Sequence, residues 1–407
     1  CKYINRLKLR GVTTYFNSPG RRESWMGITT QNDAAEYAEW LYAHVQRCRD
    51  LGVDFPYLSV KNEPSNPINK MSGAFIRDVI KILGPKLRAN GFATKFVVTD
   101  DIRSTDAEQT MTAVLTDPVA RPYVGALAFH LYDEPISNAV KMKRLSETYS
   151  LPLWMTEFSL SALGGSDALG WGNLMHDLIA DYGVSAIDYM AGFHGQEGNN
   201  TQLIKLLHET TGSQTYLRYN IEKAYYYIGQ YSRFIRQGDK RIFSASSDSS
   251  IKAAAFSNGT SLTVVAINNN YSAKTVDINL KGLPSGMTLQ AVRTSATENW
   301  AALSPVTVTS SLFTATLPAN SITTFTNRDV IVPTPTPTPA HAPTPAPSPA
   351  PNLKGDLNND GIVNSLDWSI MNSKWFKSDT KADLNGDGLV NSIDFSILNK
   401  NWFKRNN

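Results

Sequence analysis

The chain has 407 residues, of which 42% are hydrophobic and 10% aromatic, and its formal net charge is +3 at pH 7. This composition is that of a globular protein long enough for two or three domains, and so small a charge argues against nucleic acid or an anionic membrane as partner. No apolar run reaches the ~20 residues of a membrane-spanning helix, and the two cysteines, Cys1 and Cys48, are too few for a disulfide framework.

From about Val12 to Arg236 the sequence alternates between predicted strands and helices. Strands are predicted at 12–16, 57–60, 95–99, 124–130, 153–156 and 186–190, and helices at 34–51, 73–89, 168–182 and 221–235. Repeated strand–helix units favour a parallel sheet covered by helices. In such folds the chemistry takes place at the carboxyl ends of the strands. Four candidate site residues lie there: Glu63, His130, Tyr132 and Glu157.

Glu63 and Glu157 each follow a short apolar strand, among polar and aromatic neighbours. Retaining glycoside hydrolysis needs one carboxyl group as acid and base and a second as nucleophile, roughly 5 Å apart. The spacing alone also allows ordinary carboxylates at strand ends. The pattern therefore predicts a hydrolase site without establishing one.

Four segments around these glutamates resemble glycoside hydrolase family 30, a member of clan A. Residues 59–64 (SVKNEP) resemble the acid/base strand of the clan, in which Asn precedes Glu, and residues 154–159 (WMTEFS) resemble its nucleophile strand. Residues 17–19 with 25–26, and residues 227–236 with 241–242, resemble further segments of the family. The resemblance covers about residues 12–326. It implies a (β/α)8 TIM-type barrel with a β-sandwich side domain.

By this resemblance Glu63 is the acid/base and Glu157 the nucleophile, and no cofactor is needed for catalysis. Glu63 has to be protonated when the cycle begins. We expect its burial and the negative charge of Glu157 to raise its pKa.

The resemblance also implies residues that bind the substrate. Asn62 would hydrogen-bond the sugar 2-hydroxyl, and Tyr132 would hold Glu157 in its ionised form by a hydrogen bond. Trp25 either stacks on a sugar or packs its own loop. His130 either lines the cleft or is a histidine whose hydrogen bonds are satisfied within the fold.

The sequence departs from the family after the strand at 186–190. The family usually has a tryptophan there, whereas this chain continues with residues 191–197, AGFHGQE. Either Phe193 or His194 replaces the tryptophan, or the subsite is remodelled, and we interpret Glu197 as a solvated carboxylate. Family members selective for glucuronoxylan use a basic residue in this region, but no arginine lies between Asp188 and Leu217.

Counted back from Glu63, the chain begins near the third strand of such a barrel. We therefore expect a piece of a longer enzyme that lacks the first barrel strands and folds poorly or is inactive alone, because an open barrel exposes unpaired edges. For the same reason we interpret Cys1 as an internal start rather than a lipid-bearing residue. The lack of a signal peptide then says nothing about secretion.

The region before the C-terminal repeats divides into a strand-rich part and a linker. Strands are predicted at 251–256, 262–267, 275–280 and 321–325, with a hairpin turn at Asn258-Gly259. We interpret them as a β-sandwich fused to the barrel, rather than as a carbohydrate-binding module, because no row of aromatic residues is evident. The Pro/Thr-rich segment at 329–352 predicts a semi-rigid spacer.

The last part of the chain contains one calcium-loop pattern twice, at 356–367 and 383–394. Side-chain oxygens at places one, three, five, nine and twelve, with the carbonyl at place seven, can surround Ca²⁺, and glycine at place six permits the turn. The predicted ligands of two structural Ca²⁺ ions are Asp356, Asn358, Asp360, Ile362, Asn364 and Asp367, then Asp383, Asn385, Asp387, Leu389, Asn391 and Asp394.

These repeats resemble type I dockerins, modules that bind an enzyme to the cohesin of a scaffold protein. The resemblance covers about residues 355–403, and aspartate at place twelve agrees with it. It implies that the cohesin is contacted by Ser365 and Leu366 or by Ser392 and Ile393.

Together these features predict a multidomain protein: 1–236, an incomplete (β/α)8 hydrolase domain; 237–328, a β-sandwich; 329–352, a linker; and 353–407, an all-α dockerin. The predicted function is that of a secreted, extracellular, cellulosome-associated retaining glycosidase acting on plant hemicellulose of the xylan or β-galactan type. The alternatives are another clan A glycosidase, such as a glucosylceramidase-like β-glucosidase, and a catalytically silent carbohydrate-binding or scaffold subunit. The expected partners are a cohesin and a polysaccharide, without nucleic acid or a membrane span.

Overall fold

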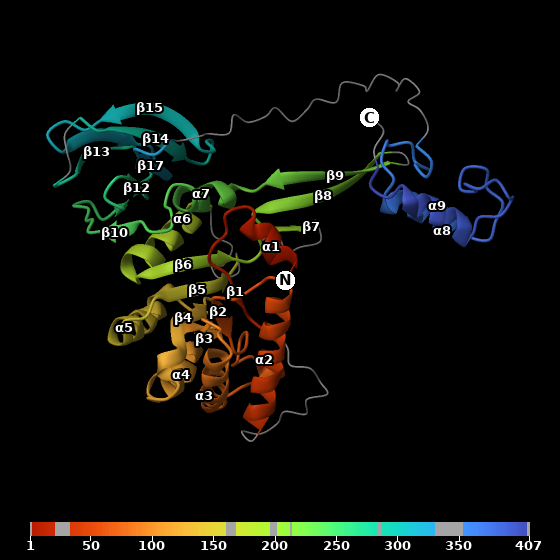
Figure 1. The fold of residues 1–407 in the computed structure, drawn as a ribbon. Helices are drawn as coiled ribbons and strands as arrows, with labels where there is room; N and C mark the ends of the chain where they lie inside the picture. Colours follow the sequence, from red (N-terminus) through yellow and green to blue (C-terminus); the bar gives the residue numbers. More distant parts are fainter. Residues whose placement is uncertain are drawn as a thin grey trace. The chain divides into compact units, whose positions relative to one another are not determined.

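The computed structural model describes residues 2–20, 33–159, 168–195, 202–211, 214–282, 286–329 and 353–404 (Figure 1). Trp25, Glu197 and most of the predicted linker lie outside these ranges. The chain divides into two compact units, residues 1–332 and 333–407, and each is described by itself.

A six-stranded parallel sheet forms the centre of the first unit. Its strands follow one another in chain order: β1 (Phe16–Asn17), β2 (Tyr57–Ser59), β3 (Lys95–Asp101), β4 (Val124–His130), β5 (Leu153–Phe158) and β6 (Val184–Tyr189). The sheet confirms the prediction of repeated strand–helix units. The first strand was predicted at 12–16, whereas the observed strand β1 has only two residues, Phe16 and Asn17.

Helices separate the strands along the chain: α1 (Lys2–Lys8), α2 (Ala34–Asp50), α3 (Gly73–Ala89), α4 (Ser104–Leu115), α5 (Ala139–Tyr149), α6 (Ala168–His176) and α7 (Lys223–Ser232). In α3, the Ser72 hydroxyl accepts a hydrogen bond from the Phe75 N–H at 3.1 Å, which caps the helix. Its buried apolar residues recur at helical spacing and face the core. None of the described helices is long and apolar enough to cross a membrane.

The central strands β3 and β4 are buried on both faces of the sheet, which is why β4 is a continuous apolar run. In β4, Leu127 and Phe129 belong to the large cluster shared with the helices, whereas Ala126 and Ala128 belong to a smaller cluster with Trp154. Successive residues of a strand point to opposite faces. The smaller cluster therefore marks the face away from the helices.

The described part of the sheet does not close into a barrel, because β1 and β6 each pair with one strand only. A cavity of about 880 Å³ is lined by Val12–Thr14, just before β1, and by Val184–Ile187 of β6. The coarse prediction of a barrel-like parallel sheet therefore holds. The described residues do not form a complete TIM barrel.

The strand-rich region forms two antiparallel sheets. The first has the order β10 (Lys240–Ile242), β11 (Ile251–Ser257), β12 (Leu262–Asn268), β17 (Ser321–Thr326), β14 (Thr288–Thr294) and β15 (Ala301–Thr307), and the second pairs β13 (Lys274–Asn279) with β16 (Leu312–Leu317). The two sheets share one hydrophobic cluster. Helices α6 and α7 pack on the larger sheet, so the domain boundary predicted near residue 236 stays a prediction.

A third, three-stranded sheet follows β6 and was not predicted: β7 (Phe193–Gly195), β8 (Ile204–Thr211) and β9 (Gln214–Ile221). Strands β8 and β9 form an antiparallel hairpin, and β7 pairs with β8 in parallel. This sheet occupies the part of the chain where the sequence departs from the family pattern.

The second unit is small and nearly symmetric. Its helices α8 (Ser365–Ser373) and α9 (Ser392–Lys400) each follow one predicted calcium loop and share a core that includes Val363, Met371, Val390 and Leu398. The end of each repeat pairs with the loop of the other. The Phe403 N–H donates to the Val363 carbonyl at 2.7 Å, and the Phe376 N–H donates to the Val390 carbonyl at 2.8 Å.

Candidate active site and calcium loops

Three predicted site residues meet at the carboxyl ends of the parallel strands. Glu63 follows β2, His130 ends β4, and Glu157 lies in β5, where it is in register with His130. One side-chain atom from each of the three residues lies within 4.8 Å of the others. The structure therefore brings together the two glutamates that lie far apart in the sequence.

The backbone at Glu63 is unusual. Its φ of 52° is in the left-handed region, which a side chain with a Cβ rarely adopts, and such residues are concentrated at functional sites. The Glu63 N–H donates to the Asp100 carbonyl at 2.8 Å, and the Glu63 carboxylate accepts a hydrogen bond from Asn66 Nδ2 at 2.9 Å. These contacts hold the carboxylate at the strand end.

His130 lies between two carboxylates and is 1% exposed. Its Nδ1 is 3.3 Å from Glu63 Oε1 and its Nε2 is 3.2 Å from Asp100 Oδ1. Burial alone would lower the imidazole pKa, but the hydrogen bonds to Asp100 and Glu63 outweigh it and raise the pKa of His130 to about 9. At neutral pH both ring nitrogens therefore carry a proton and donate.

The charge on His130 corrects the expectation for Glu63. The hydrogen bond from His130 lowers the pKa of Glu63 and outweighs the opposing effect of burial, with Asn66 contributing in the same direction. The sequence-based prediction of a raised pKa was wrong because it considered the nearby negative charge but not a cationic imidazole.

Asp100 is the buried residue that sequence reasoning missed. Its carboxylate accepts hydrogen bonds from His130, from the Ser18 hydroxyl, and from Thr156 Oγ1 at 2.5 Å. Burial opposes ionisation, but these donors keep the pKa of Asp100 below its ordinary value. The signal available in the sequence was the Asp100-Asp101 pair at the end of a predicted strand.

Tyr132 makes the contact that was predicted for it. Its hydroxyl donates to Glu157 Oε1 at 2.9 Å. Burial and the negative charge of Glu157 both raise the pKa of Tyr132, so the phenol stays neutral and remains a donor.

The other predicted substrate contacts are less fully described. Asn62 is half-buried beside Glu63, and its N–H donates to the Pro19 carbonyl at 2.9 Å. Phe193 is 70% exposed on β7, and Trp25 and the His194 side chain lie outside the described part.

Each C-terminal loop turns around the carboxylate at its first place. The Gly361 N–H donates to Asp356 Oδ2 at 2.9 Å, and the Gly388 N–H donates to Asp383 Oδ2 at 2.7 Å. The φ values of Gly361 and Gly388 are 85° and 92°. This left-handed backbone provides the sharp turn that the sixth place of a calcium loop requires.

The residue at the twelfth place is a fully buried aspartate in both loops. Asp367 and Asp394 are each 0% exposed, and each accepts the N–H of the asparagine three residues earlier, Asn364 or Asn391, at 2.8 Å. These pairs form capping boxes at the starts of α8 and α9. A buried carboxylate among other hard oxygen donors is a set that fits Ca²⁺.

The predicted cohesin contacts lie on the first turns of the two helices. Leu366 is 58% exposed and Ile393 53% exposed, and the preceding Ser365 and Ser392 are exposed as well. The predicted contact residues of both repeats are therefore accessible to a partner.

Residues 354–401 match the family described as the type I dockerin domain. This part of the chain is a type I dockerin domain. Type I dockerin domains bind calcium and associate with cohesins, which agrees with the oxygen donors of both loops and with the exposed first turns of α8 and α9. The dockerin also indicates an extracellular, cellulosomal setting.

Most of the chain is similar in structure to glycoside hydrolases of family 30. An endoxylanase of this family from Clostridium papyrosolvens C71 shares 23% identity at a TM-score of 0.61, and the alignment covers 78% of this chain and 80% of that one. The subfamily 8 xylanase Xyn30A from Clostridium acetobutylicum shares 24% identity at a TM-score of 0.62, and the alignment covers 79% of this chain and 81% of that one. The catalytic domain of xylanase C from Talaromyces cellulolyticus shares 21% identity at a TM-score of 0.64, with 80% of this chain and 78% of that one covered. At these identities the similarity establishes the fold.

Proposed function

We propose that this chain is a secreted, scaffold-docked glycoside hydrolase that cleaves a plant hemicellulose of the xylan or β-galactan type with retention of configuration. Glu157 attacks the anomeric carbon and displaces the leaving oxygen, which Glu63 protonates. Glu63 then takes a proton from a water molecule, whose oxygen replaces Glu157 on the sugar.

One observation carries this proposal: a carboxylate oxygen of Glu63 and one of Glu157 lie within 4.8 Å. Retaining enzymes hold their carboxyl groups about 5–5.5 Å apart, whereas inverting enzymes leave about 6.5–9.5 Å for a water molecule. The short separation favours the covalent route. The hydrogen bond from Tyr132 would hold the Glu157 carboxylate in position for the attack.

The pKa of Glu63 sets the pH range of the proposed reaction. Because His130 lowers that pKa in the free protein, the protonated acid is abundant only at acidic pH. The alkaline limb of a kcat/KM profile reports the pKa of the essential acid in the free enzyme. We therefore expect activity to decline as the pH rises from the acidic range to neutral.

The remaining roles complete the proposal. Asn62 would bind the sugar 2-hydroxyl, a contact that strengthens in the transition state. Two Ca²⁺ ions would be held by the loops before α8 and α9, and the first turns of these helices would bind a cohesin. The dockerin would then keep the enzyme beside its solid substrate.

Trapping with 2-deoxy-2-fluoro xylobiosides and galactosides tests the reaction. We expect a covalent adduct that peptide mapping places on Glu157, which is absent from Glu157→Gln and retained in Glu147→Gln, a matched exposed glutamate on α5. No adduct with either sugar, together with intact binding of xylan or galactan, would instead support a catalytically silent module. An adduct on another glutamate would contradict the assigned roles.

A further inference from the structure

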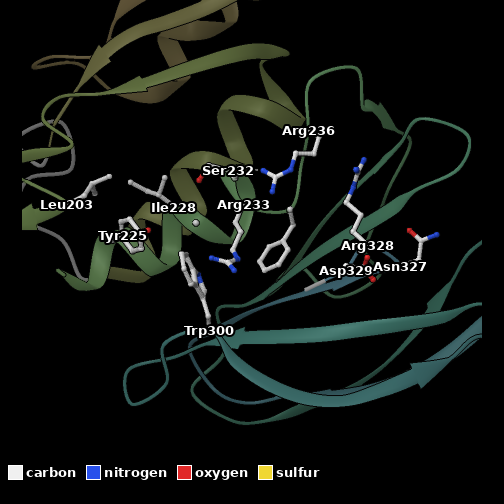
Figure 2. Close-up of a pocket in the computed structure, with 12 residues that line it drawn as sticks. Leu203, Tyr225, Ile228, Ser232, Arg233, Arg236, Trp300, Asn327, Arg328 and Asp329 are labelled. Atoms are coloured by element: carbon white, nitrogen blue, oxygen red, sulfur yellow. Dashed lines mark hydrogen bonds between the residues drawn. The ribbon is translucent and has the colours of Figure 1, made fainter. Parts of the chain in front are cut away.

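A second cavity in the first unit has a volume of about 820 Å³ and lies between α7 and the residues that follow β17 (Figure 2). None of Glu63, His130 and Glu157 lines it. Its volume is within the range of small-ligand sites, about 300–1,000 Å³. The cavity is therefore separate from the candidate active site and large enough for a sugar unit.

Three arginines line the cavity and give it a positive charge. Arg233 and Arg236 follow α7, and Arg328 follows β17 (Figure 2). Arg328 Nη2 pairs with the buried Asp239 at 2.5 Å. Asp329, also in the lining, is exposed, so the cationic groups outnumber the acidic ones.

Two of these guanidinium groups have no carboxylate partner among the described residues. Arg233 lies over the Trp300 ring, 4.7 Å from its centroid, and Arg236 Nη1 donates to the Ser232 carbonyl at 3.2 Å. In addition, Arg328 Nε is buried and has no hydrogen-bond partner within the described part of the chain. Buried donors are nearly always paired, so this one calls for an acceptor that the described residues do not supply.

One end of the cavity is apolar, and Trp300 there carries the Arg233 guanidinium group over its ring. Tyr225 and Trp300 pack with their ring centroids 5.2 Å apart, and Ile228 and Leu203 continue the lining (Figure 2). A ligand that fits this lining has an apolar ring face and an anionic group. A guanidinium group pairs with a carboxylate through two parallel hydrogen bonds.

We propose that this cavity binds a carboxylated sugar, the uronic acid unit of an acidic polysaccharide, at a site that takes no part in bond cleavage. The inference rests on the proposed function only for the choice of a polysaccharide as ligand. The carboxylate pairs with Arg233 and Arg236, and the ring packs near Tyr225. Such a site would hold acidic side chains of the polymer while the main chain is cleaved elsewhere.

Calorimetric titration of the full chain tests the proposal with two probes, a xylotriose that carries a uronic acid and unsubstituted xylotriose. We expect the acidic probe to bind at least about tenfold more tightly, and Arg233→Gln and Arg236→Gln each to weaken its binding by about tenfold, the value of one charge-assisted hydrogen bond. Arg144→Gln, an exposed arginine on α5, is the matched control and should leave binding unchanged.

Equal affinity for the two probes, or binding of the acidic probe that both cavity variants retain, would overturn the proposal. Displacement of the acidic probe by inorganic phosphate at equal concentration would also overturn it, because the site would then recognise any anion. Hydrolysis of unsubstituted xylan and galactan is measured separately. Arginine-dependent binding without hydrolysis would refute the proposed function alone, and hydrolysis without such binding would refute this inference alone.

Discussion

The contact between Asp100 and His130 makes a prediction about stability that can be measured without any substrate. We consider Asp100→Asn, which keeps the size of the side chain but removes its charge. In the structure this carboxylate is fully buried and lies 3.2 Å from His130 Nε2. Without it, the imidazole loses one of the three carboxylates that favour its charged form.

The magnitude follows from the raised pKa of His130. The group titrates at about 9 in the folded chain against 6.5 for an ordinary histidine, and each pKa unit corresponds to about 1.4 kcal/mol. The folded chain binds this proton more tightly than the unfolded chain. Its contribution of about 3 kcal/mol is therefore complete below pH 6.5, declines between pH 6.5 and 9, and is lost above pH 9.

Urea unfolding followed by tryptophan fluorescence from pH 6 to 10 measures this slope. The wild-type free energy of unfolding should fall by up to about 1.4 kcal/mol per pH unit between pH 6.5 and 9, and the slope should be much smaller in Asp100→Asn. His44 and His176 do not interfere, because burial lowers the pKa of both and their effects lie below this window. A wild-type slope in Asp100→Asn would refute the assignment of this ion pair.

Four further predictions address the site, the dockerin and the packing. In His130→Asn the alkaline limb of kcat/KM should move to higher pH, because a neutral amide lowers the pKa of Glu63 less than a cationic imidazole does; an unmoved limb would contradict this. Tyr132→Phe should lower kcat about tenfold or more with little change in KM, because a hydrogen bond to a charged group contributes about 1.5–3 kcal/mol, whereas the control Tyr271→Phe, at a 93% exposed residue, should not. Removal of Ca²⁺ by a chelator should reduce the helical circular dichroism of α8 and α9, and Asp367→Asn should weaken one loop only; an unchanged spectrum would argue against calcium-dependent folding. Gly229→Ala should destabilise the first unit by about 1–3 kcal/mol, because its Cβ would lie 2.1 Å from Trp300 Cζ2, while Gly192→Ala, with nothing within 4 Å, should have little effect on thermal unfolding.

The elements that the sequence predicted well are those with a strong local pattern. Helix α3 was predicted with its observed bounds because apolar residues recur at helical spacing after a capping serine, and β4 because it is a continuous apolar run. Helices α4 and α5 were not predicted. The Ser and Thr residues of α4 have weak helix propensity, and in α5 only Ala139 and Met142 are fully buried, so each pattern is weaker than that of α3.

The same distinction holds for the candidate site. Glu63 and Glu157 could be predicted because each ends a recognisable strand within a segment that resembles the family. The hydrogen bonds around the two glutamates could not be predicted, because they depend on Asp100 of β3, which accepts a hydrogen bond from His130 of the neighbouring strand β4. Local sequence shows that an acidic pair ends β3, but not which of the two turns toward the glutamates.

The sign of the pKa change at Glu63 depends on this missing contact. With a neutral His130, burial and the nearby Glu157 would raise the pKa of Glu63, as the sequence suggests. The buried Asp100 instead stabilises a charged imidazole, and that charge reverses the effect. A carboxylate on a third strand thus determines how acidic the proposed proton donor is, although it contacts Glu63 only through its backbone and through the imidazole between them.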